Sequence, residues 1–241
     1  MIKNTSIYIV LWFLFQLFAE VNSQLALIKP KKRYRHTTTL VGKRLYVLGG
    51  IGDDPNTGKQ FFYLDVSIPF NAKELLWQDS TSTNIVPSHD DAASVTGGAN
   101  NNTLILYSGS LDATKPLIYT LDAQNNLWSN PKLNVINIER KVQLTGVADY
   151  NGKMYLFGGM LSNVDNVMLN DMLIFDTVNL NWGKGSVVNA PTQRRNYGAT
   201  LLPNGKIIYI GGINGDHLPL NEVYLYDTIN DAWSNQVSLL K

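Results

Sequence analysis

The 241-residue sequence predicts an all-β protein made of four copies of one four-stranded unit. Two features recur in step along the chain. Tryptophans at 77, 128, 182 and 233 are spaced by 51, 54 and 51 residues. A strand-like run ending in glycine precedes each of them, as in LYVLGG, MYLFGG and IIYIGG. Four short strands separated by turn residues within about 50 residues are typical of one blade of a β-propeller.

Each unit has the same internal order. A strand of small residues, as at 36–40 and 197–201, leads into a tight turn such as Asn151-Gly152 or Asn204-Gly205. The second strand ends at the glycines, the third ends at an aspartate, and the fourth carries the tryptophan. The residues of this motif are Gly49, Gly50, Asp65, Trp77, Gly109, Asp122, Trp128, Gly158, Gly159, Asp176, Trp182, Gly211, Gly212, Asp227 and Trp233.

The motif residues have structural roles that follow from their chemistry. Glycine supplies backbone freedom where the second strand ends, and aspartate accepts hydrogen bonds from N–H groups two residues later. Tryptophan fills the space between neighbouring sheets. In three copies the aspartate and the tryptophan are six residues apart, whereas Asp65 and Trp77 are twelve apart. The first copy therefore has a longer loop at this point.

The order of Gly-Gly, aromatic-x-x-Asp and Trp closely resembles the kelch repeat, over about residues 34–241. In more detail the chain resembles the secreted fungal kelch proteins labelled galactose oxidase-like. The resemblance implies a propeller, and such propellers have about five to seven blades. We expect an incomplete ring that belongs to a longer chain. A closed four-blade ring and closure through another chain are the alternatives.

The domains predicted from this alignment are a signal peptide at 1–23, a basic leader or edge strand at 24–34, and blades at 35–80, 81–130, 131–184 and 185–241. Residues 24–28 are a candidate edge strand for a missing last blade. Positive charge at Lys3, an apolar run at 7–18 and small residues before position 24 are the three parts of a secretory signal. They predict a secreted protein or one on the outer face of the plasma membrane, with a membrane anchor only in a longer form. The sequon at Asn101 is then a candidate glycosylation site.

Composition excludes several functions. Lys+Arg is 20 against Asp+Glu 19, so the chain lacks the basic excess that a nucleic-acid binder needs to meet phosphates. The galactose oxidase label implies a copper site with a tyrosine cross-linked to a cysteine. This chain has no cysteine and cannot form that cofactor. No other cofactor is predicted.

The polar residues point to binding rather than catalysis. His36 and His89, with Asp90 or Asp91, are the best candidate metal group, yet strand-entry residues explain them better. Asp171 and Glu222 recur at one repeat position, which favours an architectural role. Variable loops at 51–59, 111–115, 160–169 and 213–220 are the expected binding segments. The candidate binding residues in these loops are Asp53, Asp54, Asp165, Asp216 and His217.

Two basic clusters remain. Lys29, Lys31, Lys32, Arg33 and Arg35 are interpreted as a solvated leader, with a dibasic processing site or an anionic ligand as alternatives. Arg194-Arg195 stands at the entry to blade 4, where the kelch pattern places arginine. The function predicted is a non-catalytic propeller that binds a protein or glycan partner. The alternative is a carbohydrate-active hydrolase or mutarotase on the same scaffold.

Overall fold

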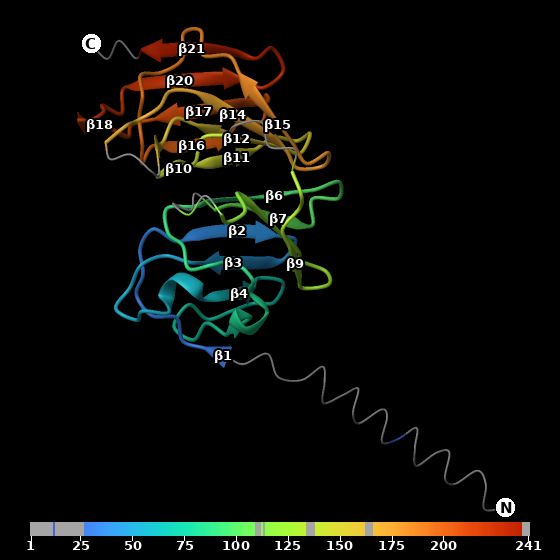
Figure 1. Ribbon diagram of the computed structural model, residues 1–241. Helices are drawn as coiled ribbons and strands as arrows, with labels where there is room; N and C mark the ends of the chain where they lie inside the picture. The colour runs from blue at the N-terminus through green and yellow to red at the C-terminus, as the bar shows by residue number, and fades with distance from the viewer. Residues whose placement is uncertain are drawn as a thin grey trace, which may run out of the picture.

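The computed structural model describes residues 27–108, 114–133, 138–161 and 166–237, together with Trp12 and Asp112. Gly109 and Asp165 lie outside the described residues, and so does the signal segment except for Trp12. The described chain is almost entirely β, and its four antiparallel sheets follow one another from blue to red in Figure 1. This confirms the all-β propeller with four four-stranded blades. The four sheets do not close into a ring.

Blades 1 and 2 occupy the N-terminal half. The strands of blade 1 are β2 (Thr37–Val41), β3 (Arg44–Leu48), β4 (Phe61–Asp65) and β5 (Trp77–Asp79). The strands of blade 2 are β6 (Ala93–Gly97), β7 (Thr103–Tyr107), β8 (Ile118–Asp122) and β9 (Leu127–Ser129). Two 3₁₀ turns, η1 (Thr57–Lys59) and η2 (Thr81–Thr83), also lie in this half. In each blade the strands pair in chain order, so successive connections lie at opposite edges.

Blades 3 and 4 repeat this topology. The strands of blade 3 are β11 (Gly146–Ala148), β12 (Lys153–Phe157), β14 (Met172–Asp176) and β15 (Asn181–Gly185). The strands of blade 4 are β16 (Gly198–Leu201), β17 (Lys206–Ile210), β20 (Glu222–Asp227) and β21 (Ala232–Val237). Two small ribbons add to them: β10 (Lys141–Val142) with β13 (Met160–Leu161), and β18 (Ile213–Asn214) with β19 (Asp216–His217).

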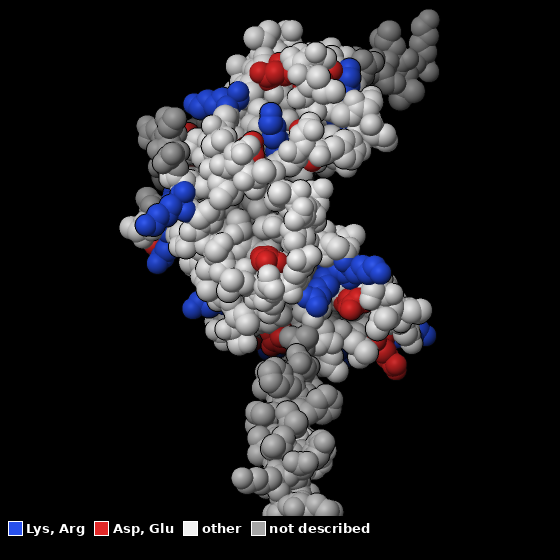
Figure 2. Space-filling view, turned by 90° about the vertical axis from the view of Figure 1, so that its right-hand side faces the viewer, with Lys and Arg blue, Asp and Glu red and all other residues white. Residues whose placement is uncertain are grey.

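The blades are arranged side by side around a curve. The first strands of consecutive blades, β2, β6, β11 and β16, contact one another in sequence. Figure 2 shows the body curving around a hollow on one side, with Lys and Arg side chains scattered over the visible face. No helix among the described residues is both long and apolar enough to span a bilayer.

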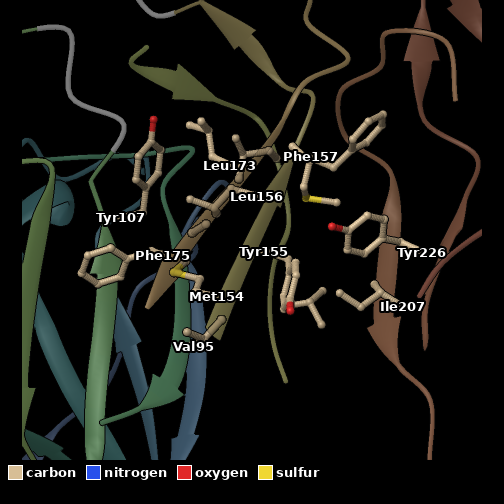
Figure 3. Packing of buried hydrophobic residues seen from close by; sticks show 14 of the residues in the cluster. Val95, Tyr107, Met154, Tyr155, Leu156, Phe157, Leu173, Phe175, Ile207 and Tyr226 are labelled. Carbon is tan, nitrogen blue, oxygen red and sulfur yellow. The ribbon is translucent and has the colours of Figure 1, made fainter. Parts of the chain in front are cut away.

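Aromatic side chains join each blade to the one before it. Trp128 of blade 2 contacts Phe61 of blade 1 with ring centroids 5.2 Å apart. Trp233 of blade 4 lies 4.8 Å from Phe157 of blade 3. Figure 3 shows Phe157 and its buried neighbours on β12 and β14 between blades 2 and 4. Trp128, Trp182 and Trp233 therefore lie between neighbouring sheets, where their size fills the gap between two blades. Trp77 departs from the prediction, because its ring partner, Phe62, belongs to its own blade.

The aspartates at the end of each third strand shape the turns that follow. Asp122 Oδ1 accepts a hydrogen bond from the Gln124 N–H at 2.8 Å, and Asp176 Oδ1 accepts one from the Val178 N–H at 2.9 Å. Asp65 and Asp227 make the equivalent contacts with the N–H groups two residues later. The glycine turns between first and second strands also recur, and Gly152 and Gly205 have positive φ angles of 77° and 76°.

The N-terminal segment differs from its prediction. Leu27 and Ile28 form β1, which pairs antiparallel with β5 through Leu27–Gln78 and Ile28–Trp77. The strand thus completes the outer edge of blade 1 and is not an edge strand for a last blade. Residues 27 and 28 are adjacent in sequence to blade 1, so pairing there needs only a short connection, which has a low entropic cost.

The outward faces of the two end blades are unlike each other. On blade 1 this face is covered: Phe62 is 1% exposed, and the Arg33 guanidinium stacks on its ring at 4.7 Å. On blade 4 the residues at the corresponding face, such as Ile208 and Leu225, are only half-buried. The leader therefore shields the first sheet, and the last sheet has no such cover among the described residues.

Candidate binding face

One edge of every blade collects the glycine ends and the residues that enter the first strands. We call it the Gly-Gly edge. In blade 1, Tyr34 pairs with Ile51, and in blade 4 Arg195 pairs with Ile213. The β10–β13 ribbon is the same pairing in blade 3. The entry segment and the loop after the glycines are thus held together in three blades, which creates a continuous face from segments far apart in sequence.

The glycine pairs permit this close approach. Gly49 and Gly50 have φ angles of 64° and 95°, which L side chains rarely adopt. A Cβ on Gly49 would lie 2.6 Å from the His89 ring. The Gly50 N–H donates to the His89 carbonyl at 2.9 Å, and the Gly159 N–H donates to the Arg194 carbonyl at the same distance. The second glycine therefore bonds one blade to the next.

A backbone ladder crosses the four blades at this edge. Its residues, which we call the ladder residues, are Arg35, Asp91, Gln143 and Asn196. Their φ angles all lie between 52° and 60°. In blades 2, 3 and 4 the N–H of the ladder residue donates to the carbonyl of the ladder residue in the preceding blade. The N···O distances are 3.0 Å for Asp91 to Arg35, 3.2 Å for Gln143 to Asp91 and 2.9 Å for Asn196 to Gln143. The blades are thereby fixed in register.

Side chains extend this ladder into a polar chain. Arg35 lies 3.4 Å from Asp91 and 3.7 Å from Asp90. Gln143 donates through Nε2 to Asp91 Oδ2 at 3.0 Å and accepts through Oε1 from Arg195. Burial raises the pKa of Asp91, although the Gln143 hydrogen bond and the Arg35 charge oppose that shift. An arginine therefore stands at each end of a continuous strip of charged and polar groups.

A second repeated position is basic in all four blades. It lies two residues before each ladder residue and is occupied by Arg33, His89, Lys141 and Arg194. Three of these side chains are buried, and Arg33 is half-buried. The solvated-leader interpretation is therefore wrong for Arg33, whose guanidinium donates to the Gly49 carbonyl at 3.1 Å and to Gln60. Arg194 donates in the same way to the Gly211 carbonyl at 3.1 Å.

The acceptor for this basic residue stands five residues before each turn aspartate. Gln60 serves Arg33, and Asp171 pairs with Lys141 at 3.1 Å. Burial lowers the pKa of Arg194, and the neighbouring Tyr224 and Glu222 oppose that shift. The recurrence of Asp171 thus has an architectural cause, its ion pair with the buried Lys141. Glu222 acts on the buried Arg194 through its charge and accepts a hydrogen bond from the Tyr224 hydroxyl.

Blade 2 replaces both members of this pair. The acceptor position is Leu117, and the basic residue is His89, which is 8% exposed. Its Nδ1 lies 2.9 Å from the Pro87 carbonyl, and its buried Nε2 has no hydrogen-bond partner. Burial lowers the pKa of His89, with smaller opposing effects from Pro87 and Asp90.

His89 makes stability depend on pH. The folded protein holds it neutral, while the unfolded chain binds a proton below a pKa of about 6.5. Stability conferred by the wild-type residue is therefore present above that pH and is lost as the pH falls below it. Relative to His89→Gln, we expect the wild type to lose up to about 2 kcal/mol of unfolding free energy between pH 8 and pH 5.

Urea unfolding of both proteins at several pH values measures this difference. The subtraction is needed because burial, followed by Arg33, also lowers the pKa of His36. Asp90 is the charged group that acts on His89 itself. A difference between wild type and variant that stays constant with pH would contradict a neutral buried His89.

The predicted binding residues lie in the loops of the Gly-Gly edge but do not meet in one cluster. Asp53 is exposed, and Asp54 accepts from Lys31 Nζ at 3.1 Å and from the Asn56 N–H at 2.9 Å. Asp216 and His217 are exposed on β19. Asp165 lies outside the described residues. No group of three His, Asp or Glu side chains that could hold a metal occurs within the described ranges.

The residues that sequence analysis missed are the ladder residues and the buried basic position. Both recur at fixed offsets from the first strands, so the signal was available in the repeat alignment. Arg35, Asp91 and Gln143 differ in charge and size, which hid their shared position. The ladder is a backbone feature, and three of its four side chains are tied together as well.

Four repeated blades, an interblade ladder and loops gathered on one edge define a kelch propeller. A family model described as the KLHDC2/KLHL20/DRC7 Kelch-repeats domain matches residues 35–239. The chain belongs to this kelch-repeat family, whose repeats generally mediate protein–protein binding.

Curated relatives carry the same repeats. The Rab9 effector protein with kelch motifs of Xenopus laevis is 22% identical over 77% of this chain and 51% of its own length. Kelch domain-containing protein 1 of Mus musculus is 23% identical over 48% of this chain and 28% of its own length. The Rho GTPase-activating protein gacHH of Dictyostelium discoideum is 35% identical over 36% of the chain, which is 6% of that protein. The chain thus spans about half or less of the relatives it matches.

Proposed function

We propose that this chain is a non-catalytic kelch propeller that binds a protein partner at the Gly-Gly edge. The polar chain from Arg35 through Asp91 and Gln143 to Arg195 is the observation that carries the proposal. Its backbone is fixed by the ladder hydrogen bonds, so little order has to be gained on binding. A pre-organised strip with arginines at both ends suits a partner of mixed charge.

Exposed apolar side chains also lie at the Gly-Gly edge. Tyr34 is 58% exposed and lies under the Arg35 guanidinium, 5.7 Å from ring centroid to Cζ. Leu220, in the loop before β20, is 71% exposed. Protein interfaces combine aromatic and arginine anchors with a polar rim. The Gly-Gly edge offers both, and the exposed loops around β18 and β19 extend it.

The test is a screen of the purified chain on arrays of extracellular proteins and glycans. Each ligand found is then titrated against wild type, the Arg35→Ala/Arg195→Ala variant and the matched control Lys206→Ala, whose side chain pairs with Asp227 at the opposite edge. We expect a protein ligand that binds the double variant at least about tenfold more weakly and the control normally. Unchanged binding by the double variant would overturn the proposal.

The same residues bear on the enzymatic alternative. Asp90 and Asp91 stand beside Arg35, and burial raises the pKa of Asp91, as a general acid requires. Their adjacency in sequence does not resemble two carboxylates placed across a cleft. Turnover of any glycan on the array, lost in Asp91→Asn, would replace binding by catalysis as the function.

We propose further that the chain is exported and glycosylated, because residues 1–23 read as a secretory signal. Asn101 is exposed in the turn before β7, and its φ of 50° places it at a tight bend. That turn lies at the edge opposite the Gly-Gly edge, so a glycan there leaves the binding face free. Expression in a secreting eukaryotic cell should give a protein beginning at Gln24 and a mass loss on deglycosylation that Asn101→Gln abolishes. A protein that stays inside the cell and keeps residues 1–23 would refute export.

A further inference from the structure

The connection between β4 and β5 sets blade 1 apart from the other blades. In blades 2, 3 and 4 the matching turns are 123–126, 177–180 and 228–231, whereas in blade 1 residues 66–76 make this connection. We call residues 66–76 the insertion. It lies where the third strand ends, which is the edge opposite the Gly-Gly edge.

The insertion exposes large apolar side chains. Ile68 is 57% exposed, Phe70 is 53% exposed and Leu76 is 57% exposed. A connection that served only to join two strands would need no more than a few turn residues, as in the other blades. Three bulky side chains left in water on one short loop instead indicate a surface for a ligand.

These side chains line a pocket. Ile68, Phe70 and Leu76 stand around a volume of about 370 Å³, and Tyr63 and Leu64 of β4 complete its apolar wall. This volume is within the range of small ligand sites, about 300–1,000 Å³, and it accommodates one or two side chains. The site is thus a shaped apolar pocket and not only a set of exposed residues.

The charges that line the pocket are all acidic. Asp65 and Glu74 belong to the lining, together with the amides of Asn71 and Gln78. Hydrogen bonds from Ser67 hold the pKa of Asp65 below its usual value, so its carboxylate is ionised at neutral pH. Among the described residues no hydrogen bond or ion pair engages the Glu74 carboxylate, and it is exposed.

Cations lie near the pocket but do not line it, and the charges of Arg44 and Lys43 act on Asp65. The Arg44 guanidinium stacks on Tyr63 at 4.8 Å and donates to the Ala123 carbonyl at 3.2 Å. Lys29 and Lys73 line a neighbouring hollow of about 430 Å³, which shares Glu74 with the pocket. The pocket itself therefore combines an apolar interior with a negative rim.

We propose that this pocket docks a short peptide segment in which a bulky apolar residue stands next to a lysine or arginine. The apolar side chain enters between Phe70 and Leu76, and the flanking cation lies at Glu74 and Asp65. Charge complementarity selects this occupant over an acidic peptide. The site is independent of the Gly-Gly edge, so the chain can bind two partners at opposite edges.

Fluorescence polarisation with three labelled peptides tests the proposal. One has phenylalanine between two lysines, the second has phenylalanine between two glutamates, and the third has serine between two lysines. We expect the first to bind at least about tenfold more tightly than either of the others. The Phe70→Ala/Leu76→Ala variant should bind it about tenfold more weakly, and Glu74→Gln about threefold more weakly with a smaller salt dependence.

Ile229→Ala is the matched control, since Ile229 is 78% exposed in the equivalent turn of blade 4 and lies outside the pocket. All variants replace exposed side chains, so their thermal midpoints should match that of the wild type. Equal binding of the three peptides, no binding of the first, or unchanged binding by Phe70→Ala/Leu76→Ala would overturn the proposal. The Arg35→Ala/Arg195→Ala variant should bind the first peptide normally, which separates this site from the proposed function.

Discussion

Replacing Trp233 by alanine should lower the free energy of unfolding by about 4 kcal/mol. The side chain is 6% exposed and lies 4.8 Å from Phe157, 5.0 Å from Tyr226 and 5.1 Å from Tyr209 between ring centroids. Its Nε1 also donates to the Ser186 carbonyl at 2.8 Å. Alanine leaves a cavity between blades 3 and 4 and an unpaired carbonyl. Urea unfolding followed by circular dichroism measures the loss.

Trp77→Ala is the comparison for this experiment. Trp77 is only half-buried, and Phe62, at 5.3 Å, is its ring partner. Its loss should cost about 2 kcal/mol, because half-buried side chains leave smaller cavities. Trp233→Phe keeps most of the volume and removes the donor, so it should cost about 1–2 kcal/mol. Equal effects of Trp233→Ala and Trp77→Ala would show that the interblade position of Trp233 has no special weight.

Replacing Asp171 by asparagine should destabilise the protein by about 3 kcal/mol at pH 7, more than removing its partner Lys141. The Lys141 side chain is fully buried, and that of Asp171 is 33% exposed. Without Asp171 the lysine keeps only the Leu156 carbonyl, which accepts from Nζ at 3.0 Å. A buried ammonium then lacks its counter-charge. In Lys141→Met, by contrast, water solvates the remaining carboxylate, and the cost should be below about 1 kcal/mol.

The pH dependence and a double-mutant cycle check this assignment. Burial lowers the pKa of Lys141 to about 8, although Asp171 opposes the shift. Between that pH and about 10.5 the unfolded chain keeps a proton that the folded protein has lost, so stability should rise with pH relative to Lys141→Met. The Lys141→Met/Asp171→Asn double variant should recover most of the loss seen in Asp171→Asn. A larger effect of Lys141→Met than of Asp171→Asn would contradict this account.

The blades could be predicted from sequence because their determinants are local. Gly-Gly, a turn aspartate and a tryptophan recur at nearly constant spacing, and each acts within a few residues of its own position. Asp176, for example, accepts from the Val178 N–H in its own turn. The positions of Trp128, Trp182 and Trp233 could be predicted as well, because a large apolar residue that recurs in each blade fills the space between sheets. Trp77 belongs to the first blade and has no preceding described sheet to pack against.

The candidate sites were harder to predict because they depend on distant residues. Arg33 reads as one member of a charged leader, yet it contacts Gly49 and Gln60 across the fold. Leu27 and Ile28 belonged to a candidate edge strand for a missing last blade, yet they pair with β5 of blade 1. Such a short strand carries no register signal that identifies its partner. The pocket at Phe70 was visible only as a longer loop. Its shape comes from the packing of that loop on β4.

The ladder and the cover over the first blade both affect how the molecule opens locally. Among the described residues, the ladder bonds each blade to its nearest neighbours, so the stack behaves as a one-dimensional chain of coupled units. At the first blade Arg33 stacks on Phe62 and covers the outward face of the sheet. This cover should slow local opening of the first blade and of the pocket that it carries.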